Sequence, residues 1–198
     1  MKKLIAFLTL AALATSAYAQ GVITFANSVL PDTPNRYVWA VDVPSFQTYP
    51  LVGTHYAAQL YYGPTASSLA AHTAAPSRFR APGSSLAGTW STATGASRTL
   101  NGGGVGVPVF LQVRVWDLNQ FATWEAAVAG GGIAGSSEVF QYTQLLSNPP
   151  APTDTYMVNF SSFTIFVPEP SAFLLAIPGV ALLLWMRNRK HQVKQERA

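Results

Sequence analysis

Alternating apolar and polar residues predict a chain of short β-strands, with one dominant strand at residues 107–116. Five apolar residues share one face of this strand: Val107, Val109, Leu111, Val113 and Val115. Gln112, Arg114 and Trp116 alternate on the other face. Pro108 is compatible with a strand start because a first residue need not donate to the ladder. We expect this strand to lie in the interior of the sheet.

Weaker alternation predicts further strands on both sides of the dominant one. The expected ranges are 22–27, 37–43, 55–62, 138–145 and 156–167, with short edge strands around Phe79 and Trp90. Prolines and glycine-rich turns separate these ranges and exclude long helices between them. A stiff surface loop is expected at 147–152, where Pro149, Pro150 and Pro152 cluster.

One short helix is predicted directly after the dominant strand. Thr123 is a suitable N-cap, Glu125 complements the positive end of the helix, and Gly130 is a suitable stop. Regularly spaced strands with so little helix are typical of a mainly β protein. We therefore expect an antiparallel β-sandwich or a jelly-roll-like domain, in which residues 21–167 form one core.

The N-terminus has the pattern of a signal peptide. Lys2 and Lys3 precede an apolar run at 4–14, and Ala17 and Ala19 supply the small residues that a signal peptidase accepts. Cleavage is expected after Ala19. The run is too short for a transmembrane anchor, and no stop sequence follows it.

The C-terminus combines an apolar run at 172–186 with a basic cluster of Arg187, Arg189 and Lys190. As a helix, residues 171–186 would span about 24 Å, at ~1.5 Å per residue. A bilayer core is about 30 Å thick, so this is a short transmembrane segment. A buried C-terminal helix is the alternative, but a basic cluster directly after the run favours a membrane face.

Pro168, Glu169 and Pro170 precede the apolar run, and the three parts together resemble the PEP-CTERM sorting signal of exported bacterial proteins. The resemblance implies an exosortase-type processing enzyme that recognises this tripeptide. Shorter stretches at 19–21, 56–61, 112–117 and 124–131 resemble PEP-CTERM proteins common in Verrucomicrobia-type bacteria, a likeness that implies no reaction. The expected division is a signal peptide at 1–19, an exported domain at 20–166, a sorting signal at 167–190 and a basic cytoplasmic tail at 191–198.

The charge distribution separates the middle of the chain from its ends. The formal net charge is +4, but residues 21–170 hold five arginines and seven acids, a net of 5 − 7 = −2, and no lysine. The basic character therefore gives no support for a nucleic-acid partner. It instead favours a topology in which Lys2, Lys3 and the C-terminal basic cluster stay in the cytoplasm, with the tripeptide just outside the membrane. Cysteine is absent, which excludes disulfides and thiolate metal sites.

Two carboxylates offer the strongest catalytic hypothesis. Asp117 and Glu125 are close in sequence and could form the acid–base pair of a glycoside hydrolase. Local roles as a turn cap and a helix cap explain both residues without catalysis, and we favour this structural interpretation. His55 and His72 lack metal-ligand spacing, so neither a metal nor another cofactor is expected. The glycine triplets at 102–104 and 130–132 lack the following Lys-Ser/Thr of a phosphate loop.

Aromatic residues are abundant in the predicted domain, and flat rings can stack on sugars. The candidates are Tyr37, Trp39, Tyr49, Tyr56, Tyr61, Tyr62, Trp90, Trp116 and Trp124. We expect most of them in the core and a few at the surface. The predicted function is that of an exported, non-catalytic cell-envelope or matrix protein with a binding or structural role, for which polysaccharide is the candidate ligand. A secreted glycoside hydrolase that uses a carboxylate pair is the alternative.

Overall fold

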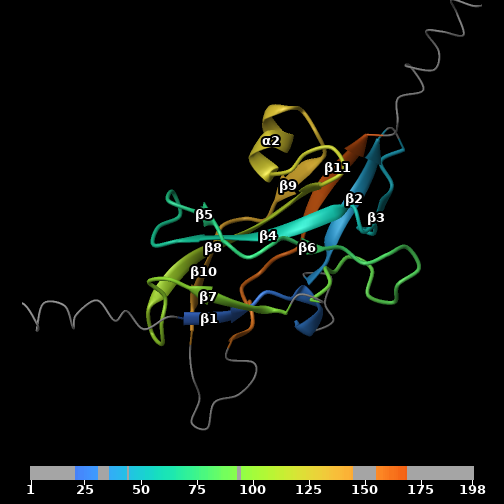
Figure 1. Ribbon diagram of the computed structural model, residues 1–198. Coiled ribbons are helices and arrows are strands. Elements are labelled where there is room, and N and C mark those ends of the chain that lie inside the picture. Colours follow the sequence, from blue (N-terminus) through green and yellow to red (C-terminus); the bar gives the residue numbers. More distant parts are fainter. Residues whose placement is uncertain (1–20, 31–35, 44, 93–94, 145–154, 169–198) are drawn as a thin grey trace, which may run out of the picture.

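The computed structural model describes residues 21–30, 36–43, 45–92, 95–144 and 155–168 (Figure 1). This part of the chain is mainly β, as predicted, with antiparallel pairing in each sheet and one short α-helix. The strands are β1 (Gly21–Thr24), β2 (Val38–Val43), β3 (Thr48–Pro50), β4 (Tyr56–Gly63), β5 (Ala70–Ala71), β6 (Ser77–Arg78), β7 (Ser97–Leu100), β8 (Pro108–Asp117), β9 (Ala134–Ser136), β10 (Phe140–Thr143) and β11 (Phe163–Pro168). The helices are a 3₁₀ turn, η1 (Asn27–Val29), and α2 (Trp124–Ala129).

The strands form three sheets. The largest follows the order β10-β8-β4-β5, with β6 added to β4 and β9 added to β8. A second sheet has the order β11-β2-β3, and β1 pairs with β7 in the third. All of these pairs are antiparallel except β2 with β11, which run parallel with Val38 opposite Phe163 and Val43 opposite Pro168. This pairing places β2, near the start of the described chain, beside β11, its last described strand.

The dominant strand predicted from the sequence is the central strand β8. It pairs with β4 on one side and with β10 and β9 on the other. Four of the five predicted apolar residues are buried: Val109, Leu111, Val113 and Val115. The fifth assignment is wrong, since Val107 lies before the strand and is 44% exposed. Val107 instead closes a tight turn, in which its N–H donates to the carbonyl of Gly104 at 3.0 Å.

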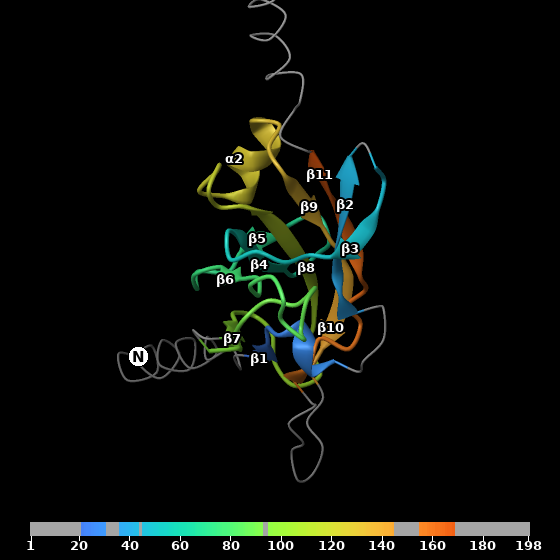
Figure 2. The ribbon, with the colours of Figure 1, turned by 90° about the vertical axis from the view of Figure 1, so that its right-hand side faces the viewer.

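One hydrophobic core is shared by all three sheets (Figure 2). Leu60 and Val113 from the large sheet, Ala40 and Ile165 from the β11-β2-β3 sheet, and Leu100 from β7 all belong to it. Aromatic rings fill its lower part around the fully buried Trp90, whose neighbours are Phe25, Phe79 and Phe160. Burial of this much apolar surface is the main stabilising contribution in a chain without disulfides.

The other face of the large sheet is covered by α2, which packs Ala127 against Ala57 and the fully buried Trp116. This helix starts and stops as predicted. The Thr123 hydroxyl accepts a hydrogen bond from the N–H of Ala126 at 3.2 Å, and the Gly130 N–H donates to the carbonyl of Ala126. Because the sheet is covered on both faces here, its outward-pointing residues are partly buried rather than solvated.

Three predicted strands are shorter than the sequence pattern suggested. The segment 156–167 begins as a turn, where the Phe160 N–H donates to the Met157 carbonyl, and becomes a strand only at Phe163. β10 covers only part of the predicted range 138–145. The edge strand expected around Phe79 is the two-residue β6, whereas Phe79 and Trp90 themselves form only an isolated bridge. The turn at 157–160 buries Phe160, and the bridge buries Phe79 and Trp90, contacts that alternation along the chain does not reveal.

β11 is the last described strand, and it crosses β9 of the large sheet. Gly135 of β9 allows this close approach, because a Cβ atom there would lie 2.5 Å from Cγ2 of Ile165. The strand extends past the predicted domain boundary at residue 166 and ends at Pro168. The predicted transmembrane segment 171–186 lies outside the described residues. Within the residues that are described, no helix has the length and apolarity needed to cross a bilayer.

Candidate functional site

The most elaborate polar cluster lies between β8 and α2, with Arg114 at its centre. The Arg114 guanidinium is held between two aromatic rings, 3.9 Å from the centroid of Tyr61 and 4.2 Å from that of Trp124. Its Nε donates to Oε1 of Gln112 at 2.9 Å, and its Nη1 donates to Oε1 of Glu125 at 3.2 Å. β4, β8 and α2 therefore converge on one cation.

Tyr61 completes this cluster. Its hydroxyl donates to Oε1 of Glu125 at 2.8 Å, so a single carboxylate oxygen serves both Tyr61 and Arg114. Burial and the hydrogen bond to Glu125 raise the pKa of Tyr61 to about 12, although Arg114 acts in the opposite direction. The phenol is thus a poor general base near neutral pH. The arrangement fixes α2 on the sheet and stacks a cation between two rings. Its polar groups bind mainly to one another, so few of them are available to a ligand.

The two predicted catalytic carboxylates have separate roles in the structure. Asp117 is buried, and its Oδ1 accepts from the Asn119 N–H at 2.8 Å while Oδ2 accepts from Nε2 of Gln120 at 3.1 Å. Glu125 belongs to the Arg114 cluster on α2. Asp117 therefore has the turn-capping partners that its structural interpretation required, whereas Glu125 lies in the first turn of α2 but binds Tyr61 and Arg114 instead of capping the helix.

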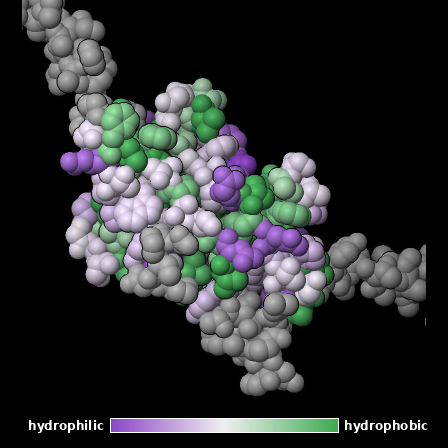
Figure 3. All heavy atoms as spheres, turned by 180° about the vertical axis from the view of Figure 1, so that it is seen from behind, coloured by the Kyte–Doolittle hydropathy of each residue, from purple (hydrophilic) through white to green (hydrophobic). Residues whose placement is uncertain are grey.

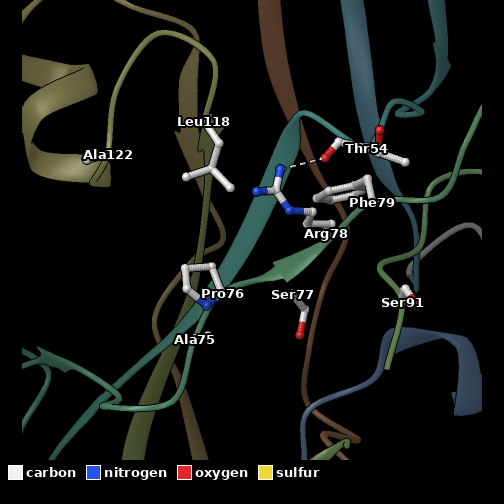
Figure 4. A pocket seen from close by; sticks show the side chains of 9 residues that line it. All are labelled: Thr54, Ala75, Pro76, Ser77, Arg78, Phe79, Ser91, Leu118 and Ala122. Atoms are coloured by element: carbon white, nitrogen blue, oxygen red, sulfur yellow. Dashed lines mark hydrogen bonds between the residues drawn. The ribbon is translucent and has the colours of Figure 1, made fainter. Parts of the chain in front are cut away.

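An open groove with a volume of about 540 Å³ lies beside β6 (Figure 4). Its nine lining residues are Thr54, Ala75, Pro76, Ser77, Arg78, Phe79, Ser91, Leu118 and Ala122. The exposed Arg78 points toward the space between Leu118 and Thr54, and its Nη1 donates to the Thr54 carbonyl at 2.9 Å. The lining contains a cation and hydroxyl groups but no carboxylate, so the groove has no acid–base pair.

A second surface is the outer face of the β11-β2-β3 sheet. Val38 and Ala40 point into the core, so the alternation of β2 places Tyr37 and Trp39 on the outside. Both rings are half-buried and meet edge to face, with centroids 5.8 Å apart. The Tyr37 hydroxyl accepts from Nη2 of Arg36 at 3.0 Å, which helps to hold its ring.

Neighbouring strands extend this outer face. Thr164 of β11 is exposed beside Trp39, and Pro50 of β3 lies on its other side. Phe166, in the same β11 register row as Val41, is 62% exposed. We call Tyr37, Trp39, Pro50, Thr164 and Phe166 the outer aromatic face. Flat apolar rings on a regular sheet suit contact with an extended ligand better than enclosure of a small one.

The remaining aromatic candidates are mostly occupied by packing. Tyr56, Tyr61, Trp90 and Trp116 are buried, while Tyr62 and Trp124 are half-buried. Tyr49 is 38% exposed on the short strand β3. Among the predicted stacking residues, Tyr37 and Trp39 are therefore the adjacent pair on an open sheet face.

His55 and His72 have packing and hydrogen-bond partners within the fold. His72 is buried, with Nδ1 accepting from the Ala74 N–H at 3.0 Å and Nε2 lying 3.0 Å from the Thr99 carbonyl. His55 lies against the ring of Tyr56. No group of three or more potential metal ligands occurs in the part of the chain that the structure describes.

The sequence patterns did not identify Arg114 as the centre of a cluster, nor Arg98 as a buried cation. Arg98 is 5% exposed and donates to the carbonyls of Gly95 and Ser97 and to the hydroxyl of Ser77. Burial lowers the pKa of its guanidinium. The sequence offered one indication of this cluster, namely an arginine within an otherwise apolar alternating strand. It could not identify the aromatic partners, because Tyr61 and Trp124 belong to other elements.

Most predicted sorting residues lie outside the described part of the chain: Ala17, Ala19, Glu169, Pro170, Arg187, Arg189 and Lys190. The exception is Pro168, whose backbone is the final position of β11, paired with Val43. The first described strand begins at Gly21, two positions after the expected cleavage site.

Comparison of the chain with protein-family models, with curated proteins and with solved structures finds no match in any of the three. The class that the fold defines is a mainly β domain with antiparallel sheets and one short helix.

Proposed function

We propose that this chain is an exported cell-envelope or extracellular-matrix protein that is sorted through its C-terminal tail. In this proposal a signal peptidase cuts after Ala19, and an exosortase-type enzyme recognises Pro168, Glu169 and Pro170. The segment 171–186 holds the precursor in the membrane until processing, with Arg187, Arg189 and Lys190 on the cytoplasmic side. The mature domain then resides in the envelope or outside the cell.

One observation carries this proposal: the two targeting segments read from the sequence directly flank the described fold. β1 starts at Gly21 and β11 ends at Pro168. Removal of residues 1–19 would leave β1 intact. Cleavage after the tripeptide would likewise leave β11 whole. Both expected cleavage positions thus lie outside the described strands, where cutting the chain would leave the strands unbroken.

We further propose that the mature domain is a β-sandwich with a non-catalytic role and binds polysaccharide on its outer aromatic face. Three sheets around one core support the sandwich assignment. Tyr37 and Trp39 support the binding role, since ring faces held by a rigid sheet can pack against the apolar faces of sugars. Exposed Thr164 offers a hydroxyl beside them.

The glycoside hydrolase alternative has weaker support. It requires two carboxylates that face one substrate across a gap of roughly 5–10 Å. Asp117 and Glu125 are engaged with separate partners, and the groove beside β6 has neither carboxylate in its lining.

The sorting proposal is tested in the native host by replacing Glu169 with Ala and following both chain ends by mass spectrometry. Glu138→Ala is the matched control, because Glu138 is an exposed glutamate within the fold. We expect the Glu169→Ala protein to accumulate as a membrane-bound precursor that has lost residues 1–19. Normal processing of both variants would refute recognition of Glu169.

The binding proposal is tested on a glycan array with the full chain in mild detergent. Trp39→Ala should remove binding, whereas Trp124→Ala, a change to the half-buried ring at the start of α2, away from the outer aromatic face, should retain it. Binding that survives Trp39→Ala would place the ligand elsewhere. Hydrolysis of any arrayed glycan, lost in Glu125→Gln, would favour the enzyme.

A further inference from the structure

The turn between β2 and β3 carries an aromatic residue in an unfavourable backbone conformation. Phe46 has a φ of 56°, and it is the non-glycine residue with positive φ among those the structure describes. Its side chain is 71% exposed. Two backbone hydrogen bonds enforce this geometry: the Phe46 N–H donates to the Asp42 carbonyl at 2.7 Å, and the Asp42 N–H donates to the Gln47 carbonyl at 3.0 Å.

A phenylalanine at this position is unfavourable for folding, because a bulky residue is costly at positive φ. Glycine and asparagine adopt positive φ at much lower cost, and bulky residues there are uncommon. The ring is not explained by core packing, since most of its surface is exposed. Strained, exposed aromatic residues at a loop tip are grounds for a functional hypothesis.

The parallel pairing of β2 with β11 determines where this tip lies. Val43 is opposite Pro168, and both strands run in the same direction. The turn that holds Phe46 therefore extends beyond the end of β11 on the side where the chain leaves the fold. Figures 1 and 2 show the β2–β3 turn and the chain exit at the same end of the molecule.

A second exposed ring lies near the same end. Phe166 is 62% exposed and comes two positions before Pro168 on β11. The space-filling view shows apolar side chains at this end of the described fold, with a strongly hydrophilic one beside them (Figure 3). By contrast, the exposed Val158 belongs to the turn after Tyr156, which bridges to Thr24 of β1 at the opposite end.

The sequence limits how far this end can be from the C-terminal apolar run. Only Glu169, Pro170 and Ser171 separate Pro168 from Ala172. Fully extended, that connection spans roughly 14 Å. The polar layer on each side of a bilayer core is about 5–7 Å thick. If the run starts at the edge of the hydrocarbon core, the end of β11 lies at or just above the headgroups.

We propose that the β2–β3 turn docks on the lipid bilayer, with Phe46 in the interfacial layer and Phe166 beside it. This inference rests on the proposed membrane anchoring of residues 171–186. Phenylalanine is among the apolar side chains that interfacial segments bury at the boundary between headgroups and acyl chains. Asp42, the acid nearest the tip, has Oδ2 hydrogen-bonded to the Ser45 hydroxyl at 2.6 Å, which reduces its exposure as a bare charge. The docked turn orients the domain relative to the membrane while the tripeptide is presented for processing.

The absence of cysteine allows a direct test with single-cysteine variants of the full chain. Phe46→Cys, Val158→Cys and Ile177→Cys are each labelled with a nitroxide in vesicles of phosphatidylethanolamine and phosphatidylglycerol. Collisions with oxygen, which concentrates in lipid, are compared with collisions with a water-soluble nickel chelate. Val158 is the matched control, because it is 67% exposed.

We expect the oxygen-to-nickel ratio to be highest at position 177 and several-fold higher at position 46 than at position 158. A label at 177 in the bilayer, with equal ratios at 46 and 158, would overturn docking but leave the anchor intact. A label at 177 in water would overturn the anchor and the docking together. The two failures are therefore distinguishable.

A second variant distinguishes the contribution of the Phe46 ring from that of the backbone conformation of the turn. Phe46→Gly suits the positive φ, so the turn should keep its conformation without the aromatic side chain. A nitroxide at the exposed Gln47, introduced as Gln47→Cys, should then lose its lipid signature when Phe46 is replaced by Gly. An unchanged ratio at position 47 would show that Phe46 does not hold the turn at the membrane.

Discussion

Ile165 covers Gly135 so closely that a Cβ atom at position 135 would meet its Cγ2 at 2.5 Å. This contact joins β11 to β9, and the Gly135 carbonyl also accepts from Nε1 of Trp124 on α2 at 3.1 Å. The last strand, the large sheet and the helix therefore meet at one glycine.

Gly135→Ala should destabilise the domain by about 1–3 kcal/mol, because the added methyl group overpacks the β9–β11 contact. Urea unfolding of the purified chain measures this change. Ser136→Ala, on the next residue of the same strand, should change the unfolding free energy much less. An unaltered midpoint for Gly135→Ala would show that β11 does not pack on β9 as described.

Arg114→Lys should destabilise the domain by roughly 1–2 kcal/mol. Lysine keeps the charge but cannot stack between Tyr61 and Trp124 as a planar group, nor reproduce the bond from Nε to Gln112. Thermal or urea unfolding provides the measurement.

Glu125→Gln is the matched change for the ionic part of this cluster. It removes the charge of an exposed carboxylate and keeps an oxygen that can accept from Tyr61. Its effect should stay below about 1 kcal/mol. A larger loss for Glu125→Gln than for Arg114→Lys would mean that the ion pair, not the stacking, dominates.

Val113→Asp should unfold or severely destabilise the domain, by about 4 kcal/mol or more, because it buries an unpaired charge in the core. Val107→Asp should change stability by no more than about 0.5 kcal/mol, since Val107 is exposed in the preceding turn. Thermal melts followed by circular dichroism, made on both variants, measure this difference between the buried Val113 and the exposed Val107.

Alkaline stability depends on two buried phenols. Burial is the main cause that raises the pKa of both Tyr56 and Tyr61 to about 12, from the ordinary value of 10.0 for a tyrosine. A raised folded-state pKa means that the unfolded chain loses these protons first. Both contributions are therefore complete below pH 10 and are lost as the pH rises from about 10 to about 12.

The free energy of unfolding should thus decline across that alkaline interval, and Tyr56→Phe should make the decline shallower. Denaturant titrations at a series of alkaline pH values test this slope. A slope that is the same in wild type and Tyr56→Phe would indicate that Tyr56 titrates normally in the folded chain.

Local patterns predicted the elements whose stabilising contacts are close in sequence. The stripe of β8 and the caps of α2, Thr123 and Gly130, were identified because alternation and capping chemistry act within a few residues. Val107 was assigned to the strand because the pattern continues through it, whereas the turn that removes it depends on Gly104 and Gly106. The prediction that 156–162 is extended was wrong because a turn, closed by the Phe160 N–H on the Met157 carbonyl, interrupts the pattern there without any glycine to signal it.

Long-range features could not be predicted in this way. The stacking of Arg114 requires Tyr61 from β4, and the outer position of Trp39 depends on which face of β2 meets the core. The parallel partner of β2 is separated from it by almost the whole domain. Spacing along a sequence carries no information on such pairings.

The parallel pairing of β2 and β11 also bears on the order in which the protein matures. In the export that we propose, the N-terminal strands would emerge first, and β2 has β3 available on only one side. Its other edge stays open until Phe163–Pro168, the last residues of the fold, have crossed as well. The nascent domain therefore presents an unsatisfied strand edge until late in translocation. Its susceptibility to aggregation should then depend on how long β2 waits, with one edge open, for β11 to arrive.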